Sequence, residues 1–299
     1  MLLSHREMHV PELDLRLDTH AVVHTRYRVH VVERRNVVSE DALLLRSFDR
    51  LGHLSRPTLT VLLEGRARIR ACGQERWLSA GDMALIEAKA GVEMRQDGAP
   101  SFLSLAIEWE PGPISCARPA GFTTGRLDAA GTAALHEAAG ALRARHTAPD
   151  RASAWLARIV AVLRASGSPL DLAPAPDLIE PVPDGMRRVG AALDGLLSNL
   201  RGRPTSVDLE TALGLGARQV NRVVAEFNER YGFNATGWRD TRLRRQLLMG
   251  ATLMTAPGAH VEGIAEAVGY GSARAFQRAL ADASLPSASA IASIVRGLE

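Results

Sequence analysis

Hydrophobic and polar positions alternate along the first third of the chain. Between residues 66 and 71, small apolar side chains alternate with three arginines, Arg66, Arg68 and Arg70. This period of two puts the apolar and basic sets on opposite faces of an extended strand. Further short apolar runs lie at residues 21–32, 43–45, 58–63, 83–86 and 102–109, with glycine-containing turns among them. The pattern predicts a small β-barrel or β-sandwich over residues 1 to about 115.

The hydrophobic period becomes helical after about residue 127. Two apolar stripes follow, one on each side of Pro149. The first consists of Leu135, Ala138, Ala139 and Leu142, and the second of Trp155, Ile159, Val160 and Leu163. Two helices are therefore expected before residue 165. Their apolar faces could form the seam of a dimer or pack on the strands of the same chain, and the pattern allows both.

A proline-rich stretch separates this part from the rest of the chain. Residues 166–185 contain Pro169, Pro174, Pro176, Pro181 and Pro183, a composition typical of a stiffened linker. A length of 299 residues also fits two domains. The expected organisation is an N-terminal domain over residues 1–165, a linker over 166–185 and a helical domain over 186–299.

The helical part begins with a short helix and a longer one joined by a glycine turn. Ser206 is expected to cap the first helix and Gly214 to end it in a left-handed turn. The next helix has a buried face with the i, i+3, i+4, i+7 spacing, formed by Val220, Val223, Val224 and Phe227. Its outward face carries Arg218, Gln219, Asn221, Arg222 and Glu226.

The same plan recurs fifty-six positions later. Residues 261–268 are the first helix, residues 269–271 the turn, and Ser272 the N-cap of the second helix. Its buried face carries Phe276, Ala279 and Leu280, and its outward face carries Arg274, Gln277 and Arg278. Two short helices joined by a tight glycine turn are typical of a helix-turn-helix unit, whose second helix enters the major groove of DNA. Arginine binds guanine there in a bidentate way, and asparagine or glutamine binds adenine.

A long helix is predicted between the two units, from about residue 235 to 254. Its apolar side carries Trp238, Leu243, Leu247, Ala251 and Met254. A helix of ~20 residues is ~30 Å long, close to the ~34 Å between successive major-groove faces of B-DNA. It could hold two reading helices against one face of a duplex while Arg244 and Arg245 neutralise phosphates. Alternatively, these arginines are merely solvated.

Composition adds modest support for a nucleic-acid partner. Residues 184–299 carry 14 arginines against 11 acidic residues, whereas the rest of the chain is balanced. The two cysteines, Cys72 and Cys116, form no disulfide framework or zinc motif, which fits a reducing cytoplasm. No run approaches the ~20 apolar residues of a membrane span, so no membrane partner is expected. The G-x-S-x-G, H-E-x-x-H and phosphate-loop motifs are missing, which argues against an enzyme.

Residues from about 186 to 296 resemble the DNA-binding domain of the AraC family of bacterial transcription regulators. The matching segments are residues 214–222, 242–248, 264–272 and 276–278. The resemblance implies two helix-turn-helix units bridged by a long helix, binding to double-stranded DNA, and contact with RNA polymerase. Family members carry an aromatic and basic residues late in the second recognition helix, where this chain has Leu280, Ala281 and Asp282. The first unit is therefore expected to supply most of the affinity.

The N-terminal part resembles the cupin-type sensor and dimerisation module of the same family. Residues 78–86 are similar to a conserved cupin segment, but residues 91–94 stand where metal-bearing cupins have a histidine. No metal or other cofactor is therefore expected, although His20, His24, His30 and His53 could in principle converge. The arginine row at residues 66–70 either faces inward toward an anionic effector or forms the solvated face of its strand.

The sequence thus predicts a two-domain α+β protein with a cupin-like β-barrel or sandwich and an all-α domain. The expected function is that of a cytoplasmic transcription regulator, an activator by family habit. A small-molecule effector and a second copy of the chain are further partners that the resemblance implies. The candidate DNA-contacting residues are Arg218, Gln219, Asn221, Arg222, Arg274, Gln277, Arg278, Ser272, Arg244 and Arg245.

Alternatives from other classes stay open. The helix-turn-helix units could bind a protein partner in place of DNA, and steep salt dependence would distinguish DNA binding from that role. A cupin-type enzyme is a weaker alternative. A DNA-repair methyltransferase with an AraC-like domain would need a Pro-Cys-His-Arg setting, and neither Cys72 nor Cys116 has one.

Overall fold

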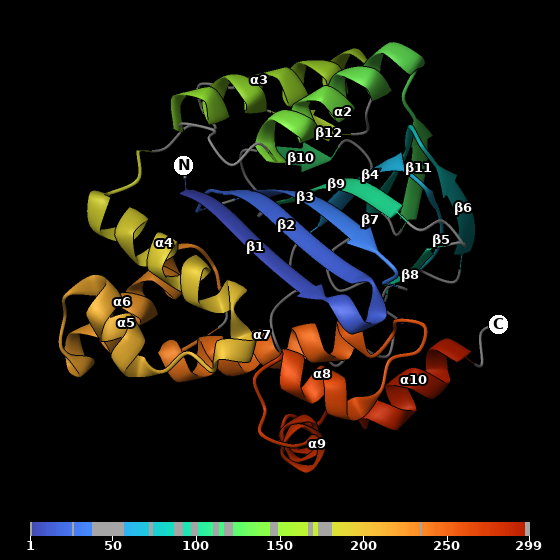
Figure 1. The fold of residues 1–299 in the computed structure, drawn as a ribbon. Helices are drawn as coiled ribbons and strands as arrows, with labels where there is room; N and C mark the ends of the chain where they lie inside the picture. The colour runs from blue at the N-terminus through green and yellow to red at the C-terminus, as the bar shows by residue number, and fades with distance from the viewer. Residues whose placement is uncertain are drawn as a thin grey trace.

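The computed structural model describes residues 2–25, 27–37, 57–71, 74–86, 92–96, 101–109, 114–116, 122–143, 149–166, 170–172, 181–233 and 235–296. Strands make up most of the N-terminal part, and helices make up the C-terminal part (Figure 1). The predicted change from strands to helices along the chain is confirmed. The apolar run at residues 43–45, which we predicted as a strand, lies outside the described residues.

A seven-stranded antiparallel sheet forms the centre of the N-terminal part. Its strands, in spatial order, are β1 (Leu2–Val10), β2 (Leu15–Val23), β3 (Tyr27–Arg35), β9 (Ser101–Trp109), β4 (Thr58–Glu64), β7 (Asp82–Ile86) and β11 (Phe122–Arg126). A 3-10 turn, η1 (Pro11–Leu13), connects β1 to β2. The apolar run at residues 21–32 belongs to two strands, because β2 and β3 pair as a hairpin with Val23 opposite Arg28.

A second sheet packs on part of the first and makes a β-sandwich. It consists of β6 (Gln74–Ser79), β5 (Arg66–Ala71) and β8 (Val92–Gln96). Apolar side chains of both sheets fill the space between them: Leu62, Ala67, Ile69, Leu78, Ala84, Ile86, Phe102 and Phe122. Because Ala67 and Ile69 point inward, Arg66 and Arg68 lie on the other face of β5. The Arg66 guanidinium lies there 4.4 Å from the centre of the Trp77 ring.

Two helices, α2 (Ala129–Arg143) and α3 (Pro149–Ala165), cover the outer face of the large sheet. Both predicted stripes are buried, and they pack against strand residues of the same chain such as Val29 and Leu105. The stripes are therefore occupied within the chain and do not form an open dimer seam. A short strand, β12 (Leu170–Leu172), pairs with β10 (Ile114–Cys116) inside the stretch that we predicted as a linker.

The C-terminal part is helical, as predicted. Its elements are α4 (Asp184–Ser198), η3 (Leu200–Gly202), α5 (Ser206–Leu213), α6 (Ala217–Arg230), α7 (Trp238–Leu253), α8 (Val261–Ala267), α9 (Ala273–Asp282) and α10 (Ala288–Arg296). The bridging helix α7 has 16 residues, so it is about 24 Å long and shorter than expected. Leu243, which we placed on its apolar side, is 38% exposed. None of the described helices is long and apolar enough to cross a membrane.

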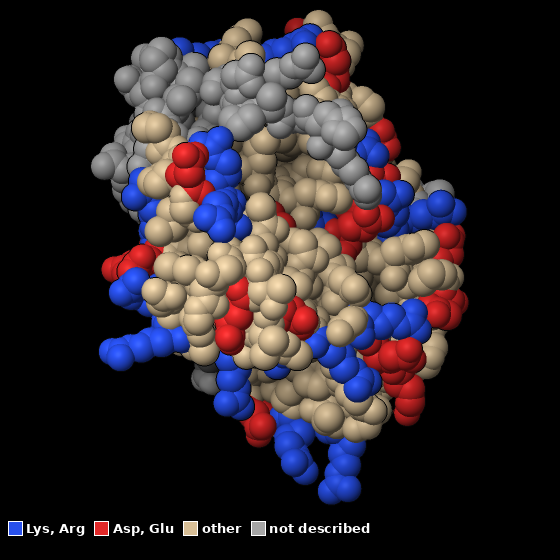
Figure 2. All heavy atoms as spheres, turned by 60° about the vertical axis from the view of Figure 1, so that its left-hand side comes forward, with Lys and Arg blue, Asp and Glu red and all other residues tan. Residues whose placement is uncertain are grey.

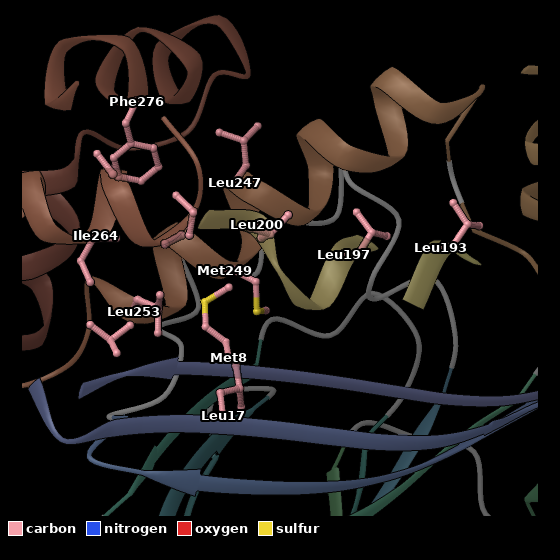
Figure 3. Packing of buried hydrophobic residues seen from close by; sticks show 14 of the residues in the cluster. Met8, Leu17, Leu193, Leu197, Leu200, Leu247, Met249, Leu253, Ile264 and Phe276 are labelled. Atoms are coloured by element: carbon pink, nitrogen blue, oxygen red, sulfur yellow. The ribbon is translucent and has the colours of Figure 1, made fainter. Parts of the chain in front are cut away.

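The N-terminal and C-terminal parts share one hydrophobic core. Met8 and Leu17, from β1 and β2, pack in the same cluster as Met249, Leu253 and Ile264 of the helices (Figure 3). Helix α4 lies along β1, where Asp194 accepts hydrogen bonds from the Ser4 hydroxyl (2.9 Å), the His5 N–H (3.1 Å) and the Arg6 Nε (2.9 Å). The core therefore crosses the boundaries predicted at residues 165 and 185.

Candidate nucleic-acid interface

Helices α5 and α6 form the first helix-turn-helix unit. Thr205, and not Ser206, is the N-cap of α5, because the Thr205 hydroxyl accepts a hydrogen bond from the Asp208 N–H at 3.3 Å. The Asp208 carboxylate in turn accepts hydrogen bonds from the Thr205 N–H (2.7 Å) and hydroxyl (2.8 Å), which lower the pKa of Asp208. Gly214 ends α5 at φ 67°, in the left-handed region, as predicted.

Helix α6 presents a basic face to the outside. Val220, Val224 and Phe227 are buried beneath it. The predicted contact residues on the other side are all exposed: Arg218, Gln219, Asn221 and Arg222. The Arg222 Nε lies 3.8 Å from Glu226, and the Gln219 side-chain oxygen accepts a hydrogen bond from the Gly216 N–H at 3.4 Å. Among the described residues, Arg218 has no recorded hydrogen bond or ion pair.

Helices α8 and α9 form the second unit. The turn between them contains Gly269 at φ 85°, and a Cβ at that position would lie 2.3 Å from the Leu200 carbonyl oxygen. Ser272 caps α9, since its hydroxyl accepts a hydrogen bond from the Ala275 N–H at 3.2 Å. Phe276 and Leu280 are buried. The predicted contact residues Arg274, Gln277 and Arg278 are exposed, and so is Ser272.

Helix α7 fixes the two units relative to each other. Its Gln246 is buried and donates a hydrogen bond to the Val268 carbonyl at the end of α8 (2.8 Å). Gly250 allows close packing on α9, because a Cβ there would lie 2.6 Å from the Phe276 ring. At its N-terminal end, Arg242 donates a hydrogen bond to the Pro204 carbonyl just before α5 (2.6 Å). The sequence did not predict the burial of Gln246.

The two arginines predicted to neutralise phosphates differ in their surroundings. Arg244 is partly exposed and pairs with Asp240 of its own helix at 2.8 Å. Arg244 and Arg245 both line a pocket between the lobes, together with Arg6 and Arg28 of the N-terminal strands, but the Arg245 Nε has no hydrogen-bond partner among the described residues. Burial, with a smaller contribution from the Arg6 charge, lowers the pKa of Arg245 to about 9. Arg245 therefore faces the strands and stays protonated at pH 7.

Basic side chains also distinguish one end of the molecular surface. Figure 2 shows Lys or Arg side chains projecting from the lower end of the molecule, the end at which α9 lies in Figure 1. Further basic side chains line the side of the same view, mixed with acidic ones. Projecting side chains of this kind can reach the phosphates and base edges of a duplex.

The cupin-like segment of the N-terminal part forms β6, a turn and β7. The turn contains Gly81 at φ 89°, where a Cβ would lie 2.8 Å from the Thr132 hydroxyl of α2. Of the four histidines considered, His24 stacks on Tyr27 at 4.5 Å and His30 lies 3.6 Å from Glu108. His20 stacks instead on His5 at 4.3 Å, and His53 lies outside the described residues. Cys72 lies outside them too, and the description of Cys116 is limited to its backbone.

Comparison with solved structures finds similar chains at low identity. ToxT from Vibrio cholerae with an unsaturated fatty acid bound aligns at a TM-score of 0.33 and 11% identity, covering 92% of this chain and 98% of that chain. The AraC-like transcriptional activator CuxR aligns at a TM-score of 0.34 and 12% identity, over 78% of this chain and 80% of that chain. Protein Ylba from E. coli aligns at a TM-score of 0.30 and 12% identity, over 38% and 45% of the two chains.

No protein-family model matches the sequence, and none of the curated proteins compared with it is a match. With TM-scores below 0.5, the likenesses assign no function to the chain.

Proposed function

We propose that this chain is a sequence-specific DNA-binding transcription regulator of the AraC type. One observation carries the proposal. Two short helix pairs, each joined by a left-handed glycine turn, present exposed arginines at equivalent positions of their second helices, Arg218 and Arg222 on α6 and Arg274 and Arg278 on α9. A second helix of this kind fits the major groove, where arginine distinguishes guanine from other bases.

The two units are proposed to contribute unequally. Helix α6 carries Arg218 and Arg222 together with Gln219 and Asn221, whereas α9 ends at Asp282 and adds no basic residue after Arg278. Arg244 is kept as a phosphate contact, while the Arg245 Nε, which has no hydrogen-bond partner among the described residues, favours another role for Arg245. Ser272, Gln277 and the arginines of α9 complete the proposed interface.

Fluorescence anisotropy with labelled genomic DNA fragments tests the interface. We expect Arg218→Ala to weaken specific binding by about 1–3 kcal/mol, and Arg274→Ala to weaken it less. Arg187→Ala is a matched control, because Arg187 is an exposed arginine on α4 outside both units. An equal or larger loss for Arg274→Ala would contradict the unequal division. Binding that is insensitive to salt would favour a protein partner over DNA.

The inter-lobe pocket is the proposed site of a small-molecule effector. Apolar residues line it alongside Arg245: Leu193, Leu197, Phe227, Phe233 and Leu248. The Arg245 Nε has no hydrogen-bond partner among the described residues, and a buried charge of this kind is stabilised by an anion. At a volume of about 80 Å³, the pocket limits the ligand to a very small carboxylate such as propionate.

Calorimetric titration of the full chain with propionate tests the effector site. We expect binding to the wild type and a loss of binding in Arg245→Met. Propylamine, which has the same chain length and the opposite charge, is the control ligand. Equal binding of propionate to wild type and Arg245→Met would contradict this placement.

The remaining expectations concern assembly and regulation. We infer that the protein activates transcription by contacting RNA polymerase. It does so in the cytoplasm, where its DNA target lies. We also infer that it acts as a dimer. Because the apolar stripes of α2 and α3 pack on their own sheet, a dimer would use residues outside these stripes. Sedimentation of the protein with and without DNA measures the stoichiometry, and a monomer in both conditions would contradict the dimer.

A further inference from the structure

Pairing of β1 with β2 brings together polar side chains that are distant in the sequence. His5 lies opposite His20, and Glu7 lies opposite Asp18. Side chains alternate between the faces of a strand, so these four lie on the face opposite to Met8 and Leu17, which enter the shared core. His5, Asp18 and His20 line a cavity of about 270 Å³, which Gly140 and Arg143 of α2 also border.

Three of these side chains converge at metal-ligand spacing. A ring nitrogen of His5 and carboxylate oxygens of Glu7 and Asp18 all lie within 4.8 Å of one another. Ligands bound at ~2.0–2.2 Å from one ion are ~3–4 Å apart, so small side-chain movements would complete the geometry. His20, stacked on His5 at 4.3 Å, stands beside them.

Asp18 indicates that this is more than an exposed acidic patch. It is 2% exposed, and its Oδ1 has no hydrogen-bond partner among the described residues. A buried carboxylate oxygen without a partner is costly, and a cation would satisfy it.

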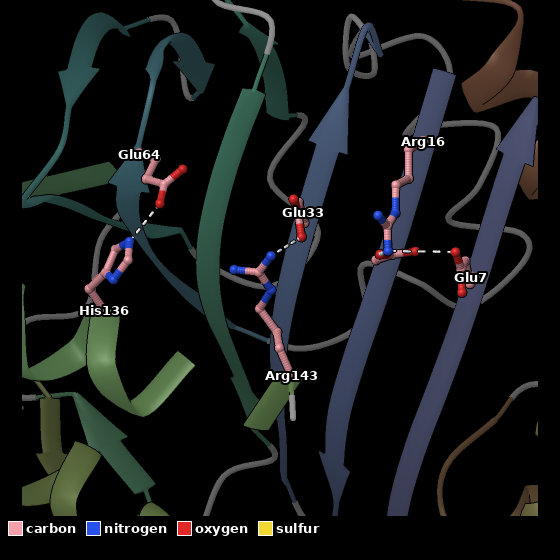
Figure 4. Close-up of polar contacts among 7 residues, drawn as sticks. Glu7, Arg16, Glu33, Glu64, His136 and Arg143 are labelled. Carbon is pink, nitrogen blue, oxygen red and sulfur yellow. Dashed lines mark hydrogen bonds and ion pairs between the residues drawn. The ribbon is translucent and has the colours of Figure 1, made fainter. Parts of the chain in front are cut away.

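The neighbouring arginines leave room for a cation. Arg16 lies 2.6 Å from the Asp18 Oδ2 and 3.5 Å from Glu7, but its side chain is 45% exposed and can withdraw into solvent (Figure 4). Arg143 bonds to Glu33, which lines the same cavity as Asp18 and is the third carboxylate beside Glu7 and Asp18. Three carboxylates against two guanidiniums leave a net negative charge.

We propose that His5, Glu7 and Asp18 bind a divalent first-row transition-metal ion, with His20 as a further ligand. Imidazole together with carboxylate ligands favours ions such as Zn²⁺ or Mn²⁺ over Mg²⁺ and Ca²⁺, which take oxygen ligands alone. This site lies outside the cupin-like segment at residues 78–86. It revises the expectation that the chain takes no metal, because strand pairing supplies the ligands that the cupin motif lacks.

The proposed site is directly connected to the helices. The His5 N–H donates to the Asp194 carboxylate (3.1 Å), and the His5 carbonyl accepts from the Ser198 hydroxyl (3.4 Å), both on α4. Helix α4 packs on α5 and α6. If the proposed DNA binding holds, metal occupancy would change DNA affinity through this contact.

Calorimetric titration of the EDTA-treated, tag-free full chain with ZnCl₂ and MnCl₂ tests metal binding without DNA. We expect one ion per chain for at least one of the two metals, and no comparable binding of MgCl₂. His5→Ala and Glu7→Gln, both at half-buried positions, should weaken binding at least about 10-fold. His136→Ala is the matched control, because His136, on α2, pairs with Glu64 of β4 and lies outside the cluster.

Circular dichroism checks that each variant folds. The Co²⁺ absorption spectrum of the wild type, compared with that of His5→Ala, gives a second readout of imidazole ligation. Failure of both ZnCl₂ and MnCl₂ to bind the wild type, or equal binding by wild type and the His5→Ala/Glu7→Gln double variant, would overturn the proposal.

Discussion

At the scale of single residues, Gly269 is the position on which the second helix-turn-helix unit depends most directly. Its φ of 85° disfavours any side chain, and a Cβ would approach the Leu200 carbonyl oxygen to 2.3 Å. Gly214 has a similar φ of 67° at the corresponding turn of the first unit, but nothing lies within 4 Å of its Cβ position. A side chain at either glycine would strain the backbone, but only a side chain at Gly269 would also clash with a neighbouring atom.

We predict that Gly269→Ala lowers the free energy of unfolding by more than about 2 kcal/mol, whereas Gly214→Ala lowers it by about 1 kcal/mol. The difference is the clash with Leu200, because both substitutions place alanine in the left-handed region. Urea unfolding followed by circular dichroism measures both. Equal losses would show that the Leu200 contact relaxes freely.

Arg245 gives a second prediction at this scale. Its pKa in the folded chain, about 9, lies well below the ordinary value of an arginine. The folded state therefore binds its proton less tightly than the unfolded state, so the charge destabilises the folded state in full below pH 9. The penalty is relieved as the pH rises above about 9.

We therefore expect Arg245→Met to raise the free energy of unfolding at pH 7 by about 1–4 kcal/mol. This gain should shrink when the same urea titrations are repeated above pH 9. Arg244→Met, which removes an arginine already paired with Asp240, is the control and should give no gain. If Arg245→Met lowered the free energy of unfolding, the claim that the Arg245 charge destabilises the folded state would be wrong.

Residue-level periodicity in the sequence predicted the burial of Val220, Val224 and Phe227 on α6, whereas Val223 and Ala279, predicted on the buried faces of α6 and α9, are only partly buried. It did not predict the environments of Arg245 and Gln246. Periodicity identifies the face of a helix, whereas these two side chains are buried by elements far away in the sequence. Arg245 meets β1 and β3 through Arg6 and Arg28, and Gln246 meets the end of α8.

At the scale of elements, the packing of α9 on α7 determines how the second recognition helix is presented. Gly250 of α7 leaves room for the Phe276 ring of α9, since a Cβ at Gly250 would lie 2.6 Å from that ring. A larger side chain there must push α9 away from α7. Arg274 and Arg278 of α9 would then still be exposed, but they would be displaced relative to the first unit.

We predict that Gly250→Val weakens DNA binding while α5 and α6 stay folded, as measured by anisotropy and hydrogen exchange. Gly195→Ala on α4 is the matched control, because nothing lies within 4 Å of its Cβ position. That substitution should stabilise the helix by about 0.5–1 kcal/mol and leave DNA affinity unchanged. Unaltered affinity in Gly250→Val would argue against a role for α9 in the interface.

Elements were predicted well where one periodicity dominates, as in α2, α3, α6 and α9. Their boundaries were predicted less well. The apolar run at residues 21–32 forms a hairpin that the sequence did not predict, because the turn after Val23 contains neither glycine nor proline. Helix α7 begins only at Trp238 because Gly237 is its N-cap. The strand β12 forms among prolines because it pairs with β10, which the local sequence does not indicate.

At the scale of the whole molecule, the shared core joins the strands to the DNA-binding helices. Leu17 of β2 is 4% exposed and packs in the same cluster as Leu253 and Ile264. The sequence pattern predicted two separate domains because the N-terminal part has the period of strands and the C-terminal part the period of helices. Apolar and polar residues alternate along β1 and β2 as they do along any half-buried strand. The sequence therefore could not predict that the apolar face of these strands packs on α4 and α8.

We predict that both parts unfold in one transition, because neither can open without exposing this core. Leu17→Ala should lower the midpoint of urea unfolding by the same amount for the strands, followed by Trp109 fluorescence with the other three tryptophans replaced by phenylalanine, and for the helices, followed by circular dichroism. The expected loss is about 2–5 kcal/mol. Two transitions, with the second unaffected by Leu17→Ala, would show that the parts are energetically independent.

The most direct test of the central claim is selection of random-sequence duplex DNA by the full chain, followed by sequencing. We predict an enriched bipartite site, whose stronger half is lost in the Arg218→Ala/Arg222→Ala variant and whose weaker half is lost in Arg274→Ala/Arg278→Ala. No enrichment over the starting pool, or an enriched site that is unchanged in both double variants, would contradict the assignment of α6 and α9 as DNA-reading helices.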